Sequence, residues 1–158
     1  MKITIITVGK IKEKFTLDAI KEYEKRLSKF VELNDITLLD EPIPDNASKN
    51  MEEIILKKEG EKIINSLPKN SYVVVLAIEG REFDSISFAD KIENIYNTNS
   101  HITFIIGASL GLSDEVKKLA NLKLSFSKMT FPHNLMKVIL LEQIYRSFKI
   151  INGEKYHK

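Results

Sequence analysis

The chain has 158 residues, of which 43% are hydrophobic and 29% charged, a composition typical of one globular domain with a full core. It contains no cysteine, which excludes disulfides, thiolate metal sites and thiol nucleophiles. The net charge of +2 hides an asymmetry, because residues 117–158 carry +7 and residues 1–116 carry −5. This asymmetry predicts an anionic partner on one side of the molecule.

Two further classes of protein are disfavoured by the sequence. The apolar run Ile3–Val8 is too short for the core of a signal peptide, and no run is long enough to span a bilayer. The three histidines lack the spacing of metal ligands, so we expect no metal site. A cytoplasmic protein is the simplest interpretation.

Strands and helices are predicted to alternate along the chain. In order they are strand 3–8, helix 12–28, strand 31–39, a helix that starts within 45–48 and runs through 64, strand 72–78, helix 87–96, strand 102–106, helix 114–119, strand 122–126 and helix 132–151. Strands 72–78 and 102–106 are continuous apolar runs, as expected when helices cover both faces of a sheet. The pattern predicts one α/β domain with a mostly parallel sheet and helices on both faces.

Helical spacing identifies the faces that should be buried. In helix 12–28, Phe15, Ile20 and Leu27 fall on one face. The final helix is apolar nearly all round, which indicates either a central core helix or coverage by a second subunit. We expect a homodimer that buries this helix.

Two short segments follow apolar strands, where α/β proteins bind ligands. In Leu76–Gly80, a plain turn explains the sequence better than a site does. In Gly107–Gly111, two glycines would let backbone N–H groups approach a ligand, and a structural turn is about as good an explanation. The spacing matches neither a dinucleotide fingerprint nor a P-loop.

The segment Leu124-Ser-Phe-Ser-Lys-Met-Thr-Phe-Pro-His133 is the strongest candidate site. Its aromatic and Met side chains are suited to wall a pocket for a flat apolar group, while hydroxyls and backbone groups fix the polar edge of that group. His133 alone is as often a surface or capping residue as a catalytic one. The tail 153–158 is predicted to lie beside this pocket, with function and fraying equally plausible.

These segments together resemble the RlmH family (YbeA), SPOUT-class methyltransferases. The resemblance covers the full chain and is carried by Lys2–Lys10, Tyr23–Arg26, Ile106-Gly107, Gly111-Leu112, Leu124–His133, Glu142–Arg146 and Tyr156–Lys158. It implies a single SPOUT domain over 1–158 with a C-terminal trefoil knot. It also implies methylation of N3 of a pseudouridine in 23S ribosomal RNA of the assembled ribosome, with S-adenosylmethionine as donor.

By the same resemblance, eight residues would bind the donor. They are Leu76, Gly107, Phe126, Ser127, Lys128, Met129, Thr130 and Phe131. The chain departs from the family at Ala108, where Gly is usual, and at Lys158, where other members have Arg. The first change is expected to weaken or shift donor binding slightly, and the second argues against a bidentate contact at that position.

Transfer of the methyl group to N3 requires removal of a proton, so a general base is needed. His133 and His157 are candidates, Glu142 is a third, and Tyr156 would stack on or orient the base. Phosphates would be held by Lys128, Arg146, Lys155 and Lys158. The alternatives are a non-catalytic ribosome- or RNA-binding protein and a tRNA methyltransferase of the same fold.

Overall fold

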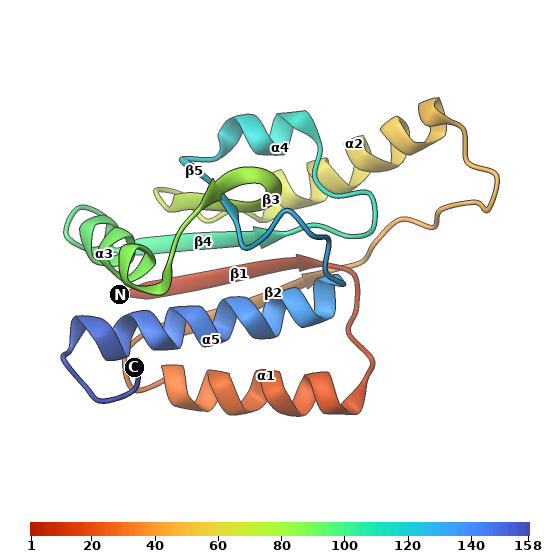
Figure 1. The fold of residues 1–158 in the computed structure, drawn as a ribbon. Coiled ribbons are helices and arrows are strands. Elements are labelled where there is room, and N and C mark those ends of the chain that lie inside the picture. The colour runs from red at the N-terminus through yellow and green to blue at the C-terminus, as the bar shows by residue number, and fades with distance from the viewer.

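The computed structural model describes all 158 residues, and five strands alternate with five helices (Figure 1). In chain order they are β1 (Lys2–Val8), α1 (Lys14–Leu27), β2 (Glu32–Leu38), α2 (Lys49–Ser66), β3 (Tyr72–Glu82), α3 (Ser85–Tyr96), β4 (His101–Ile106), α4 (Asp114–Leu119), β5 (Leu122–Ser125) and α5 (His133–Ile151). Every predicted element is present. No helix is both long and apolar enough to cross a membrane.

The five strands form one sheet in the order β2-β1-β4-β3-β5, and every pairing is parallel. The predicted α/β fold with a parallel sheet is therefore confirmed. β1 and β4 are buried along almost their whole length, as expected of strands that helices cover on both faces. Because the strands are parallel, the segments that follow β3, β4 and β5 leave the same edge of the sheet.

Helices cover both faces of the sheet, as predicted. α1, α3 and α5 pack on one face, while α2 and α4 lie on the other (Figure 1). Neighbouring residues in a strand point to opposite faces, so Ile5 belongs to the first core and Ile6 to the second. Burial of each such side chain stabilises the fold by about 1.5–3 kcal/mol.

Side chains cap three of the helices that follow strands. Ser48 accepts a hydrogen bond from the Met51 amide at the start of α2, and Asp84 accepts one from Ser87 at the start of α3. Ser113 does the same for Val116 at the start of α4. Each cap satisfies an amide that has no partner within its helix, typically worth about 1 kcal/mol.

Two sequence-based expectations need correction at the level of single residues. Phe15 was expected on the buried face of α1, but it is 68% exposed, while Ile20 and Leu27 are buried there. Pro132 was expected at the first position of the final helix, but it is the residue before it, and α5 begins at His133. Both are differences of placement within correctly predicted helices.

Most of the apolar surface of α5 is covered by its own chain. Leu140, Leu141 and Ile144 have no exposed surface, because α5 packs between α1 and α3 against the sheet. The nearly all-round apolar sequence thus has the first of its two explanations, a central core helix. The burial of α5 does not by itself require a second subunit.

One buried ion pair fixes the N-terminal half of α5 to the edge strand. Nζ of Lys137 lies 2.7 Å from both carboxylate oxygens of Asp35 on β2. The Lys137 side chain is 3% exposed and the Asp35 side chain 31%. The pair therefore places a nearly dry ammonium against a partly hydrated carboxylate.

This difference in exposure predicts that removing Asp35 and removing Lys137 lower the free energy of unfolding by different amounts. Asp35→Ala strands a buried ammonium and should lower the free energy of unfolding by about 3 kcal/mol. Lys137→Met leaves a carboxylate that water reaches and should cost about 1 kcal/mol. Urea unfolding of both variants measures the difference, and an equal or reversed cost would contradict this description of the pair.

Candidate functional site

A cleft of about 740 Å³ lies at the carboxyl edge of the sheet. Its walls come from the end of β3, the loop after β4 and the segment between β5 and α5, with contributions from α4 and α5. Twelve of its 22 lining residues are hydrophobic. The size and lining match those of a site for a small organic molecule, which is usually about 300–1,000 Å³.

β3 contributes to the cleft through an irregular segment. It pairs with β5 up to Leu76 and resumes pairing at Arg81, so residues 77–80 leave the ladder. A plain turn was expected here, but β3 continues to Glu82. Gly80 is needed for close packing, because a β-carbon there would lie 2.7 Å from the Lys123 carbonyl.

Glu79 projects from this irregular segment and forms an ion pair with α4. Its Oε1 lies 2.7 Å from Nζ of Lys117, and both residues line the cleft. The hydrogen bond from Lys117, and next the segment's own backbone N–H, hold the pKa of Glu79 below its usual value. The group is therefore a carboxylate at neutral pH.

The loop after β4 folds tightly on itself. The Gly111 amide donates to the Ala108 carbonyl at 2.9 Å, and Gly111 has a φ of +78°. A β-carbon on Gly107 would lie 2.6 Å from the Gly111 carbonyl oxygen. Gly107 is thus required to close this turn, which is the structural explanation that the sequence left about equal to a ligand-binding one.

Side-chain hydrogen bonds shape the segment between β5 and α5. The Ser125 hydroxyl donates to the Ser127 carbonyl at 3.0 Å, and the Ser127 hydroxyl accepts from the Met129 amide at 3.0 Å. Phe126 packs edge-on against Phe88 with ring centroids 6.4 Å apart, which anchors the start of the segment in the core. Met129 is 74% exposed at the cleft.

Seven of the eight residues predicted to bind the donor line this cleft. They are Leu76, Gly107, Phe126, Ser127, Met129, Thr130 and Phe131. Lys128 is exposed and does not line it, so its side chain is free to reach solvent or a partner. The residues that the sequence pointed to at three separate places therefore meet in one cavity.

His133 also lines the cleft, at the first position of α5. A β-carbon on Gly9 would lie 3.1 Å from its Nε2, so the imidazole packs on the backbone just after β1. Nε2 is buried and has no hydrogen-bond partner in the protein. An unpaired buried polar atom of this kind is unusual and marks His133 as a candidate for contact with a ligand.

The chain tail forms a second cluster, on the C-terminal half of α5. Oε1 of Glu142 accepts hydrogen bonds from Arg146 at 2.6 Å and from the Tyr156 hydroxyl at 3.1 Å. Arg146 also contacts Nδ1 of His157 at 3.3 Å, and its guanidinium lies 4.7 Å from the centre of the Tyr156 ring. The tail is thus packed on the helix, although no catalytic role follows from this packing alone.

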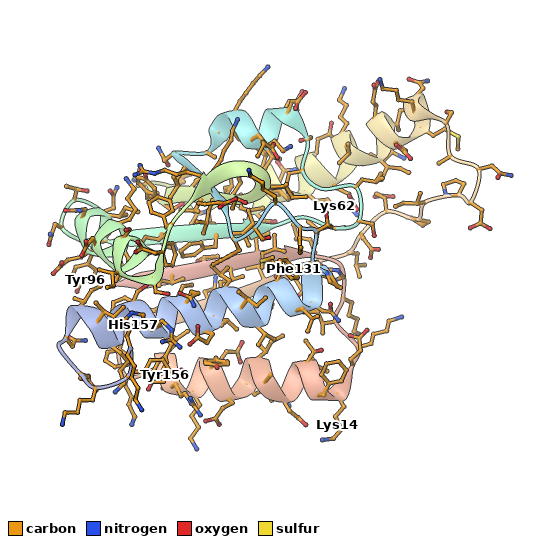
Figure 2. The ribbon with its side chains drawn as sticks, in the orientation of Figure 1. Lys14, Lys62, Tyr96, Phe131, Tyr156 and His157 are labelled. Atoms are coloured by element: carbon orange, nitrogen blue, oxygen red, sulfur yellow. The ribbon has the colours of Figure 1, made fainter.

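The cleft and the tail cluster lie at opposite ends of α5. Figure 2 shows Phe131 near the start of the helix and Tyr156 and His157 near its other end. His133 and Arg146 are separated by about 20 Å along the helix axis, at 1.5 Å per residue. The expectation that the tail lies beside the pocket is therefore wrong within one chain.

The structure also separates free cations from paired ones. Four of the nine basic residues in 117–158 pair with acids, namely Lys117, Lys137, Arg146 and Lys149. The other five are exposed and have no ion pair, namely Lys118, Lys123, Lys128, Lys155 and Lys158. Of the predicted phosphate-binding residues, Arg146 is committed to Glu142, and three lysines remain free.

The sequence pointed to neither Lys117 nor Met136, and at Glu79 it favoured a plain turn over a site, although all three residues line the cleft. Lys117 and Met136 lie on helices and only the fold brings them to the cavity. Glu79 was within a segment judged to be a plain turn, although its position after a strand was a usable signal. No cluster of three or more His, Cys, Asp or Glu side chains has the geometry of a metal site.

Comparison with known proteins identifies the protein family to which the chain is similar. A family model described as predicted SPOUT methyltransferase matches residues 1–157. The chain is 55% identical to ribosomal RNA large subunit methyltransferase H of Clostridium beijerinckii and 57% identical to that of Clostridium botulinum. It is 56% identical to a putative enzyme of this name from Methanococcus maripaludis. All three matches cover the whole of both chains.

A solved structure shares the fold at low sequence identity. A probable methylase family protein from Haemophilus influenzae superimposes with a TM-score of 0.56 and 12% identity. The match covers 99% of this chain and 70% of that one. At this identity the likeness is one of fold alone.

The tail cluster yields a prediction about ionisation. Burial, and next the Glu142 carboxylate, raise the pKa of Tyr156 to about 12 from an ordinary value of 10.0. A raised pKa favours the folded state below about pH 10, and this contribution is lost as the pH rises through about 12. Tyr156 is thus a neutral phenol at physiological pH.

Absorbance of tyrosinate tests this ionisation. Between pH 9 and 11, wild type and Tyr156→Phe should form equal amounts of tyrosinate, because Tyr156 remains protonated in this range. A smaller signal from Tyr156→Phe than from wild type would show that Tyr156 ionises normally.

Proposed function

We propose, from the premise that the chain belongs to the SPOUT methyltransferase family, that it methylates ribosomal RNA of the large subunit. The observation that carries this proposal is full-length identity of 55–57% to enzymes of that name. The finer assignment is N3 of a pseudouridine in 23S RNA of the assembled ribosome, in the cytoplasm. Membership of the family supports this finer assignment and also a trefoil knot in the C-terminal half.

The methyl donor is S-adenosylmethionine, bound in the cleft at the carboxyl edge of the sheet. The volume of the cleft and its mixed polar and apolar lining suit a nucleoside with an apolar face and a polar edge. The half-buried Phe126 offers an apolar surface, while backbone groups of the Gly107 loop and the Ser127 turn offer hydrogen bonds. The donor supplies an electrophilic methyl group, and the protein supplies orientation.

The protein must also accept the proton that N3 of the target base loses. His133 suits this role, because the residue lines the cleft and its Nε2 makes no hydrogen bond within the protein. Glu142 is less suited, because its carboxylate already accepts from Arg146 and Tyr156. Tyr156 orients the base as a neutral hydroxyl and ring, in keeping with its raised pKa.

The RNA backbone is bound by the unpaired lysines of the C-terminal third. Lys128 lies next to the cleft, and Lys155 and Lys158 are exposed in the tail. Their side chains are the ones that can exchange counterions for phosphates without breaking an ion pair. Arg146 instead shapes the tail through Glu142 and His157.

The active unit is a homodimer in which each tail completes the cleft of the other subunit. One chain holds its tail about 20 Å from its own cleft, along the rigid α5. A two-fold axis across α5 sets the start of one helix beside the end of the other. The apolar side chains of Met129, Phe131 and Leu135, between 37% and 74% exposed at the start of α5, would be covered in such a pair.

Methylation of ribosomes tests the proposed activity. The purified protein is incubated with labelled S-adenosylmethionine and with either free 23S RNA or whole ribosomes, and mass spectrometry locates the methyl group. We expect a methyl group at N3 of a pseudouridine, formed on ribosomes. Donor binding without RNA methylation, or methylation of tRNA, would contradict the assigned substrate, and absence of donor binding would favour a non-catalytic RNA-binding protein.

Mixing two inactive variants tests the shared site. Gly107→Val disrupts the cleft by colliding with the Gly111 carbonyl, and deletion of residues 156–158 removes the tail. Each variant alone should be inactive. After the two are refolded together, random pairing gives half heterodimers with one intact site each, or about a quarter of wild-type activity.

The activity of the mixture shows whether each tail completes the cleft of its partner or the cleft of its own chain. If each tail served its own cleft, no mixture would contain an intact site and activity would stay at background. Circular dichroism and sedimentation of each variant provide the control that both remain folded and dimeric. A monomer at micromolar concentration would also contradict the proposal.

A further inference from the structure

Glu79 and Lys117 are the two formally charged side chains in the lining of the cleft. The other lining residues are apolar, carry hydroxyls or, in His133, an imidazole. The pair joins the irregular segment of β3 to α4 at 2.7 Å. The proposed mechanism does not use either charge, which raises the question of what a carboxylate does in a nucleoside site.

The carboxylate of Glu79 has spare capacity to accept hydrogen bonds. The ion pair with Lys117 is made through Oε1 at 2.7 Å, while a carboxylate offers about four acceptor positions on its two oxygens. The Glu79 side chain is 54% exposed, so these positions are open to the cavity and solvent. A neutral group with two adjacent O–H donors would satisfy them without displacing Lys117.

We infer that Glu79 binds the ribose hydroxyls of the donor and that Lys117 is a positioning residue for its carboxylate. This inference rests on the proposed function, because it assumes a nucleoside in the cleft. A vicinal diol presents two donors to one carboxylate, as acidic residues accept ribose hydroxyls in other α/β nucleotide sites. Specificity for ribose over deoxyribose would then be a property of this one side chain.

The competing assignment is the amino-acid end of the donor, which carries an ammonium and a carboxylate. To bind there, it must either place like charges side by side or separate Glu79 from Lys117 and replace each charge with a like one. That exchange breaks a 2.7 Å ion pair and gains little, because equal contacts are lost and formed. The diol adds hydrogen bonds to an intact pair, and we therefore assign the ribose.

Binding of four ligands by calorimetry tests the assignment. The ligands are S-adenosylmethionine, S-adenosylhomocysteine, methylthioadenosine, which lacks the amino acid, and the 2′,3′-dideoxy form of methylthioadenosine. Glu79→Ala should weaken the first three by the same factor, roughly ten- to a hundredfold, as for hydrogen bonds to a charged group. The dideoxy ligand should bind wild type and Glu79→Ala equally.

Two variants serve as matched comparisons. Glu82→Ala removes an exposed carboxylate from the same strand, outside the cleft lining, and should leave all affinities unchanged. Lys117→Ala should weaken the three ribose-containing ligands by a smaller factor than Glu79→Ala, because it only frees the carboxylate to move. Thermal unfolding checks that each variant is folded, as expected for side chains at a cleft rim.

Three results would overturn the inference. If Glu79→Ala weakens S-adenosylmethionine but not methylthioadenosine, the pair binds the amino-acid end. If Glu79→Ala changes no affinity while wild type binds all the ribosides, Glu79 lies outside the donor site, and the proposed function stands without it. If wild type binds none of the adenosine ligands, the donor site itself is misplaced.

Discussion

The pairing of β3 with β5 at one edge of the sheet is the constraint on which the cleft depends. β5 can lie against β3 only because Gly80 has no side chain, since a β-carbon there would be 2.7 Å from the backbone of Lys123. This contact holds the irregular residues 77–80 above the end of the sheet and brings the segment after β5 beside the loop after β4. Three loops from distant parts of the sequence thereby enclose one cavity.

Helix α5 connects the cleft to the edge strand β2 and to the C-terminal tail. Its first residue lies in the cleft, its buried Lys137 is fixed to Asp35, and its last turns carry the tail. A straight helix of this length cannot bring both ends to one place, so the cleft and tail of one chain are kept apart. The proposal of a second subunit therefore rests on the position of the tail, since the apolar core of α5 is already covered.

The sequence predicted those features that depend on local periodicity. The continuous apolar runs of β3 and β4 predicted buried parallel strands, and the hydroxyl-rich segment before His133 predicted much of the cleft. It did not predict the continuation of β3 past Gly80, because the reason is a close approach of β5 that is far away in sequence. The Glu79–Lys117 pair was missed because it depends on how α4 docks, whereas the distance between tail and cleft follows from the length of α5, which the sequence did predict.

Hydrogen exchange with and without S-adenosylmethionine tests the central claim most directly, namely that three loops at the carboxyl edge form the donor site. Added donor should slow exchange of backbone amides in residues 77–80, 107–111 and 126–133 together, while the N-terminal turns of α2 exchange as before. Protection confined to one of these segments, or found elsewhere in the chain, would contradict the site described for this protein.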